Sequence, residues 1–232
     1  MSPRAARLRI NEIFHSIQGE GTRAGQRCVF VRLTGCHLRC TYCDTEYSFY
    51  EGDWRSLDEV LAEVRSYNCP FVEITGGEPL LQPDVYELMD RLLAITPVVA
   101  LETSGAVSIA RVDSRIVRIV DVKTPSSGEA DRNHWPNLEL LTANDELKFV
   151  IGSRADYEWS CDVLHKHQLI GRCPILFSPV IGVPVEQSSG LQLAQGHLDA
   201  RELAEWMLAD KLDVQFSLQV HKFIWSPTTR GV

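Results

Sequence analysis

Hydrophobic residues along the chain fall into short runs that are bounded by glycine, proline or polar residues. Seven of these runs have the length and composition of strands, at 28–33, 71–75, 98–102, 116–122, 147–151, 175–180 and 214–220. Most of them lack strict alternation of apolar and polar residues. Strands of this kind are typical of a parallel sheet that is buried on both faces.

Helical patterns lie between several of these strands. Ser56 and Glu59 have the spacing of a capping box, and an apolar stripe follows them through residue 64. Three further helices are predicted: one opened by Pro83, one begun by Asp199 with Glu202, and one over residues 155–167.

The alternation of strands and helices predicts an α/β fold, specifically an incomplete (partial) TIM-like barrel of parallel strands with reduced helices. We expect reduced helices because residues 103–115 have little helical periodicity and residues 124–144 have the composition of a loop. No repeat or linker divides the chain, so we expect a single domain over residues 1–232. In a barrel of this kind the functional residues lie at the carboxyl ends of the strands.

Composition narrows the class of protein. Hydrophobic residues make up 44% of the chain, which is enough for a substantial core, yet no apolar run approaches the roughly 20 residues that cross a bilayer. We therefore expect a cytoplasmic protein without a membrane segment. The formal charge is -8, which argues against binding to a phosphate backbone, so no nucleic-acid partner is expected.

Three of the seven cysteines, Cys36, Cys40 and Cys43, are crowded into eight residues directly after a predicted strand. Their C-x3-C-x2-C spacing supplies three soft ligands. Three thiolates suit a [4Fe-4S] cluster with one open iron, while zinc would need a fourth ligand such as His37 or Cys28. The spacing alone therefore does not distinguish a [4Fe-4S] cluster from a zinc site.

A second motif, Thr75-Gly76-Gly77-Glu78-Pro79, follows the next predicted strand. Paired glycines let a ligand approach the backbone, although alone they would indicate only a tight turn. Together the two motifs resemble the radical S-adenosylmethionine (SAM) enzymes. The resemblance implies that the three cysteines hold a [4Fe-4S] cluster, that Gly76, Gly77 and Glu78 contact the methionyl part of SAM, and that reductive cleavage of SAM yields a 5'-deoxyadenosyl radical.

Further segments narrow the resemblance. Residues 16–21, 30–36, 43–45 and 219–222 closely resemble the 7-carboxy-7-deazaguanine synthases, and matching blocks extend from Asn11 nearly to the carboxyl end. That family implies a carbon-nitrogen lyase that converts 6-carboxy-5,6,7,8-tetrahydropterin to 7-carboxy-7-deazaguanine with loss of ammonia, on the route to queuosine. It also implies Mg2+, an external one-electron donor of the flavodoxin kind, and a homodimer.

The resemblance assigns roles to residues beyond the two motifs. Thr45 is the implied magnesium ligand. The implied substrate contacts are Ile17, Gln18, Gly19, Glu20, Arg32, Thr75, His221 and Pro227. The implied SAM contacts also include Ser104, Asp121, Val122, Lys123 and Ser178, although Asp121-Val122-Lys123 departs from the Ser-Pro-Lys form of many members.

Two of these assignments can also be weighed on physical grounds. Arg32 lies on the strand that leads into the cysteine motif, where a planar guanidinium can bind a carboxylate through two parallel hydrogen bonds. His221 is expected at the end of the last strand, where a histidine is more often structural than ligand-binding.

Two other functions remain open at this stage. A glycyl-radical-enzyme activase also resembles the C-x3-C-x2-C and GGEP pattern, but it would act on a partner protein. A non-catalytic zinc-stabilised binding domain would use the same cysteines without any reaction. Turnover of the carboxypterin without a partner, and metal analysis, separate these alternatives.

Overall fold

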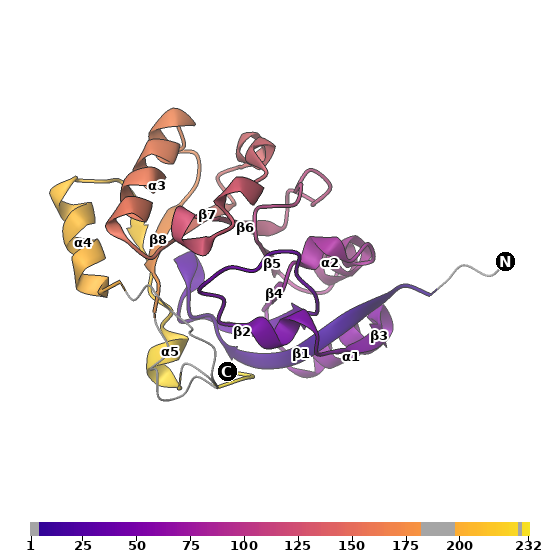
Figure 1. The fold of residues 1–232 in the computed structure, drawn as a ribbon. Helices are drawn as coiled ribbons and strands as arrows, with labels where there is room; N and C mark the ends of the chain where they lie inside the picture. The colour runs from indigo at the N-terminus through magenta and orange to yellow at the C-terminus, as the bar shows by residue number, and fades with distance from the viewer. Residues whose placement is uncertain (1–4, 182–197, 227–228) are drawn as a thin grey trace.

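The computed structural model describes residues 5–181, 198–226 and 229–232, and within them the strands form one curved sheet (Figure 1). The order across the sheet is β3-β1-β2-β4-β5-β6-β7-β8-β9. The strands are β1 (Arg7–Ile17), β2 (Arg27–Leu33), β3 (Asp53–Ser56), β4 (Phe71–Gly76), β5 (Val98–Thr103), β6 (Val117–Val122), β7 (Glu146–Ile151), β8 (Ile175–Pro179) and β9 (Gln215–Phe216).

From β2 onward each strand is parallel to its neighbour, as in a partial TIM-like barrel, so the expected fold class is confirmed. The pairs that contain β1 are antiparallel. The hydrophobic runs did not predict β1 or β3. In β1 the buried Leu8 and Ile10 alternate with more exposed arginines, so this strand carries no continuous apolar run.

Five α-helices connect or follow the strands in the described residues: α1 (Leu57–Ser66), α2 (Val85–Leu93), α3 (Arg154–Lys166), α4 (Ala200–Ala209) and α5 (His221–Ile224). The capping box before α1 is confirmed, because Ser56 Oγ accepts from the Glu59 amide and the Glu59 carboxylate accepts from the Ser56 amide. Asp199 caps α4 as expected. Residues 103–115 contain no helix, and three short 3-10 helices lie within the predicted loop 124–144.

The end of the chain corrects one prediction. The expected strand at 214–220 is reduced to Gln215–Phe216, and His221 begins α5 instead of ending a strand. The Val220 amide donates to the Gly19 carbonyl at 2.9 Å, and the amides of Phe223 and Ile224 donate back to the Val220 carbonyl. The chain therefore turns into a helix where the apolar run suggested extended backbone.

The two faces of the sheet have different neighbours. On β2, alternate residues Val29, Val31 and Leu33 belong to the large core that the helices cover. Their neighbours Cys28 and Phe30 belong to a second cluster inside the curve of the sheet, with Phe14, Phe71, Ala100, Val117 and Ile119. This inner apolar cluster lies toward the amino ends of the parallel strands. Their carboxyl ends are left for polar side chains.

Candidate active site

A cavity of about 210 Å³ lies at the carboxyl ends of the parallel strands, above the inner apolar cluster. Its polar wall is formed by inward-facing residues near the carboxyl ends of β2, β4, β5, β6 and β7. These wall residues are Arg32, Thr75, Glu102, Asp121 and Lys148. Alternate residues of each parallel strand point inward, and these inward-facing residues change from mainly apolar near the amino ends to mainly polar or charged at the carboxyl ends.

The three clustered cysteines line this cavity in the loop that follows β2. All three are partly buried, and the Leu38 amide donates to Cys36 Sγ at 3.4 Å. Burial raises the pKa of Cys43 to about 11 and also raises the pKa values of Cys36 and Cys40. Metal binding must therefore displace thiol protons, as is usual for cysteine ligands.

Gly76 and Gly77 bring the end of β4 directly against the cysteine loop. Gly76 has φ +135°, which favours glycine, and a Cβ there would lie 2.2 Å from the Leu33 carbonyl oxygen. A Cβ on Gly77 would lie 2.1 Å from the Gly35 carbonyl oxygen and 2.9 Å from Cys36 Cβ. The two glycines are required by this packing, and both line the cavity.

Glu78 lies behind the cavity and does not line it. Its side chain is fully buried, and its carboxylate accepts hydrogen bonds from Thr103 Oγ1 at 2.9 Å, the Ser104 amide at 2.8 Å and the Leu80 amide at 3.0 Å. These contacts tie the end of β4 to the end of β5. Ser104, which was expected to contact SAM, is thereby held at the cavity wall.

Arg32 faces the cavity from the end of β2. Its Nε donates to Glu12 Oε1 at 2.8 Å, and the Tyr47 hydroxyl donates to the same oxygen at 2.9 Å. The guanidinium also stacks near the rings of Phe14 and Tyr47. Glu12 therefore holds the Nε side of the guanidinium, and among the described residues no hydrogen bond or ion pair engages the two Nη groups, which can bind a ligand.

Lys148, on β7, lies at the centre of a buried ion cluster. Its Nζ lies 2.6 Å from Glu20 Oε2 and 2.8 Å from Glu102 Oε1. Thr75 Oγ1 donates to the other Glu102 oxygen at 3.0 Å. Burial alone would lower the pKa of Lys148, but the two carboxylates raise it well above its ordinary value. The lysine is therefore a fixed positive charge in the wall.

The segment after β1 crosses to this wall. The Gln18 side chain is buried, and a Cβ on Gly19 would lie 2.1 Å from His221 Nδ1, so only glycine fits there beside the histidine. Ile17, Gln18 and Gly19 line a second cavity of about 70 Å³, which shares Glu20, Thr75, Glu102, Lys148 and His221 with the first. Burial lowers the pKa of His221 despite the nearby Glu20, which favours the neutral imidazole.

Asp44 joins the cysteine loop to α5. Its Oδ2 accepts from Lys222 Nζ at 2.6 Å and from Gln219 Nε2 at 3.2 Å, while Thr45 Oγ1 donates to Oδ1 at 3.1 Å. The nearby ammonium of Lys222 holds the pKa of Asp44 below its ordinary value against the opposing effect of burial. The expected magnesium ligand Thr45 thus lines the cavity next to the third cysteine.

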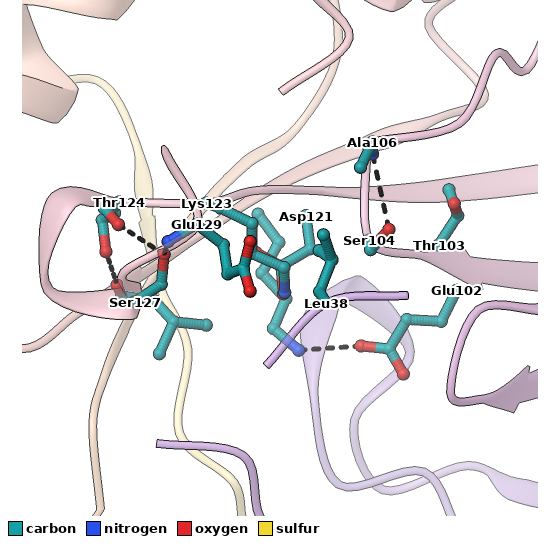
Figure 2. Close-up of polar contacts among 12 residues, drawn as sticks. Leu38, Glu102, Thr103, Ser104, Ala106, Asp121, Lys123, Thr124, Ser127 and Glu129 are labelled. Carbon is teal, nitrogen blue, oxygen red and sulfur yellow. Dashed lines mark hydrogen bonds and ion pairs between the residues drawn. The ribbon is translucent and has the colours of Figure 1, made fainter. Parts of the chain in front are cut away.

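Of the three residues at the end of β6 that were expected to bind SAM, two line the cavity and one faces away from it. Lys123 Nζ donates to Asp121 Oδ2 at 2.6 Å, whereas the buried Asp121 Oδ1 has no partner. Both side chains line the cavity, and Figure 2 shows Asp121 near Ser104 and Glu102 at the ends of neighbouring strands, with Leu38 of the cysteine loop beside them. Val122 faces away from the cavity, into the helix-covered core.

Of two other residues expected in the site, one does not line the main cavity, and the other is not among the residues that the structure describes. Ser178 is buried on β8, and the cavity wall there consists of Val180 and Ile181. Pro227, an expected substrate contact, lies outside the described residues. The site therefore contains most of the expected residues, but not every one of them reaches the cavity.

Several residues of the cavity wall were given no role in the site by the sequence. Lys148, Lys222 and Gln219 form ion pairs or hydrogen bonds that close the wall, and Tyr42 lines it between the second and third cysteines. A charged residue inside an apolar strand run was the available indication for Lys148, since a buried lysine needs a carboxylate partner.

The comparisons with known proteins agree with this geometry. A model described as the radical SAM superfamily matches residues 30–182. The chain is 44% identical over 230 residues to the 7-carboxy-7-deazaguanine synthase of Chlorobaculum tepidum, covering 98% of each chain. It is 46% identical over 230 residues to that of Koribacter versatilis, covering 97% of this chain and 100% of the relative. The chain belongs to the 7-carboxy-7-deazaguanine synthase family.

Solved structures support the fold of this family member. A crystal structure of QueE from Escherichia coli has a TM-score of 0.68 at 24% identity and covers 93% of this chain and 95% of its own. A structure of Streptococcus suis SuiB bound to SAM has a TM-score of 0.54 at 12% identity, covering 80% of this chain and 48% of that one. Each of these two structural similarities is evidence for the fold only.

Membership in the radical SAM superfamily implies a [4Fe-4S] cluster and SAM, and the residues present fit both groups. Three free thiols line the cavity, and Asp121 Oδ1, which has no hydrogen-bond partner among the described residues, gives it a buried acceptor. Within the described residues, no three His, Cys, Asp or Glu side chains converge as ligands of a single metal ion would. In a cluster each cysteine binds a different iron, so its sulfurs need not converge.

The described helices are short or polar compared with a membrane span. Among them, none is long and apolar enough to cross a membrane.

Proposed function

We propose that this 7-carboxy-7-deazaguanine synthase family member converts 6-carboxy-5,6,7,8-tetrahydropterin to 7-carboxy-7-deazaguanine with loss of ammonia, in a route to queuosine. The observation that carries the proposal is a single cavity that is lined both by three thiols and by Arg32, Lys148 and two carboxylates paired with the lysine. Relatives that carry this activity in their name match at 44–46% identity over nearly the whole chain.

Cys36, Cys40 and Cys43 would hold the cluster, and Gly76, Gly77, Ser104, Asp121 and Lys123 would contact SAM. When bound, the cluster and SAM supply the carbon radical that abstracts a hydrogen atom from the substrate. The protein positions the substrate carbon for that abstraction. The buried wall around it limits access of water.

The other residues of the wall would bind and orient the pterin. The Nη groups of Arg32 suit the substrate carboxylate, while Glu20 and Glu102 suit the N–H groups of the heterocycle. His221 favours its neutral form and can donate or accept one hydrogen bond at each ring nitrogen. The contact with Lys148 lowers the pKa of Glu102 and so keeps this carboxylate ionised as an acceptor.

Replacing Arg32 with lysine should weaken use of the carboxypterin by about 1–3 kcal/mol in kcat/KM. A lysine cannot hold Glu12 and also present two parallel N–H groups to a carboxylate. Uncoupled SAM cleavage should largely survive. Arg55→Lys, at a surface ion pair with Glu63, is the matched control and should match the wild type. Wild-type kinetics in Arg32→Lys would remove the proposed contact.

We propose that Mg2+ binds between Thr45 and the substrate carboxylate, because this hard cation prefers oxygen ligands while the thiolates suit iron. Removing Mg2+ should depress turnover and leave the absorption spectrum of the cluster unchanged. Thr45→Ala should blunt the response of the rate to added Mg2+. Superimposable Mg2+ titrations of the variant and the wild type would exclude Thr45, and no activation of the wild type would remove magnesium from the reaction.

Membership in the family also supports proposals about the electron donor, the oligomeric state and the cellular location. We propose an external one-electron donor of the flavodoxin kind, a homodimer and a cytoplasmic location. Sedimentation of the cluster-loaded protein at two concentrations tests the dimer. These proposals do not change the roles of the cavity residues.

The function is tested by incubating the cluster-loaded protein with SAM, a reductant, Mg2+ and the carboxypterin under anaerobic conditions, without any second protein. Consumption of the carboxypterin, followed by chromatography, is the expected result. A glycyl-radical-enzyme activase needs a partner protein and would leave the pterin unchanged. A zinc-stabilised binding domain would also leave it unchanged and would contain zinc on metal analysis.

A further inference from the structure

Glu73 is a buried carboxyl group to which neither the family comparison nor the sequence assigned a role. It faces inward from β4, is 2% exposed and lines the second cavity. Gln18 Nε2 donates a hydrogen bond to Glu73 Oε2. The carbonyl oxygen of the same Gln18 side chain accepts from the Glu20 amide at 3.0 Å. The Gln18 carboxamide is thus held at both ends, one of them by Glu73.

The charges around Glu73 leave it without a cation. Lys148 is the nearby cation, and its ammonium is shared by Glu20 and Glu102 at 2.6 and 2.8 Å. Of the other titratable groups on the surrounding elements, Glu146 of β7 accepts hydrogen bonds from Thr22, while His221 of α5 favours its neutral form and Cys28 of β2 is a buried thiol. In the part of the chain that the structure describes, no ion pair includes Glu73.

Three carboxyl groups therefore surround one ammonium group in a buried space. Full ionisation of all three would leave two uncompensated negative charges there, which is strongly unfavourable. Burial raises the pKa of Glu73 well above its ordinary value, and the charges of Glu102 and Glu20 raise it further. The pKa of Glu102 is instead lowered, because its contact with Lys148 outweighs the effect of burial. Glu73 is therefore favoured over Glu102 as the carboxyl group that holds a proton.

We propose that Glu73, as a neutral carboxylic acid, is a positioning residue that orients the Gln18 carboxamide and with it the pterin-facing segment 17–20. The inference rests on the proposed function, because this segment contains the expected pterin contacts. Since Glu73 Oε2 accepts from Gln18, the proton resides on Oε1. A carboxylate at this position would repel Glu20 and disturb the segment that Gln18 supports.

The protonation of Glu73 is tested by infrared spectroscopy of the substrate-free protein at neutral pH. The wild type should show the carbonyl band of a protonated carboxylic acid, and Glu73→Gln should lose it. Glu63→Gln, which removes a carboxylate at a surface ion pair, should keep the band. A band that persists in Glu73→Gln overturns the proposal, because the proton then belongs to another group. This measurement is independent of turnover.

The positioning role is tested by the KM for the carboxypterin. Glu73→Ala should raise KM by about tenfold with little change in kcat, and Glu73→Gln should raise it by about threefold, because an amide is also neutral and can still accept from Gln18. As the pH rises through the raised pKa of Glu73, the wild-type KM should increase as the group ionises. The KM of Glu73→Gln should not follow this rise.

A double mutant separates positioning from general structural damage. Once Gln18→Ala has removed the carboxamide, adding Glu73→Ala should have little further effect on KM. Fully additive effects, or an equal pH dependence in Glu73→Gln and the wild type, would overturn the positioning role. If the wild type did not consume the carboxypterin at all, the proposed function would fail. The infrared result would still decide the protonation of Glu73.

Discussion

Replacement of any one of Cys36, Cys40 or Cys43 with alanine is expected to abolish reductive cleavage of SAM. The three thiols line the cavity, and a [4Fe-4S] cluster with an open iron needs all three as ligands. Iron content, the absorption spectrum of the anaerobic protein and formation of 5'-deoxyadenosine measure the effect. The loss should be complete, because no other wall residue in the described part of the chain supplies an equivalent soft ligand.

Cys161→Ala is the matched control for these three variants. Cys161 is a half-buried thiol on α3, far along the chain from the cysteine loop, and it lines neither cavity. Its cluster content and SAM cleavage should equal those of the wild type. Retained cleavage in any one of the three loop variants would remove that cysteine from the ligand set.

Lys148→Met is expected to destabilise the protein by about 3–5 kcal/mol and to abolish turnover of the carboxypterin. The substitution leaves Glu20 and Glu102 in the wall without their cation. Removing one member of a buried ion cluster costs more than the cluster contributes as a whole, because the remaining charges are uncompensated. Denaturant unfolding of the cluster-free protein measures the first effect, and the anaerobic assay measures the second.

The pH dependence of this destabilisation has a definite sign. Without Lys148, burial and mutual repulsion raise the carboxyl pKa values in the folded variant above those of the unfolded chain. The loss in the free energy of unfolding, relative to the wild type, should therefore be largest at neutral pH. It should become smaller as the pH falls and the carboxyl groups take up protons. Lys166→Met, at the exposed end of α3, should unfold like the wild type. A deficit that is equal at acid and neutral pH would contradict the assigned ion cluster.

Much of the fold was predictable because its determinants are local. The capping box at Ser56 and Glu59 and the N-cap Asp199 fixed two helix starts, and continuous apolar runs located β2 and β4 through β8. β1 was missed because its polar residues alternate with buried ones, as expected where only one face is fully covered. His221 was misplaced because a four-residue helix leaves almost no periodic pattern.

The candidate site was predictable to the extent that its residues lie in contiguous motifs. The cysteine loop and the paired glycines are each a few residues long, and the structure packs them against each other. Lys148, Glu73 and Glu102 come from three different strands, and their proximity depends on the register of the sheet. Glu78 lies within a contiguous motif, and its position there indicated a SAM contact. In the structure its carboxylate accepts hydrogen bonds from Thr103, Ser104 and Leu80.

The most direct test of the proposed function is mass analysis of the product formed by the cluster-loaded protein. The protein is incubated anaerobically with SAM, a reductant, Mg2+ and 6-carboxy-5,6,7,8-tetrahydropterin, and released ammonia is quantified in the same samples. We predict a product with the mass of 7-carboxy-7-deazaguanine and one ammonia for each product molecule, with neither formed by the Cys43→Ala variant. SAM cleavage with unchanged carboxypterin and no ammonia would contradict the proposed function.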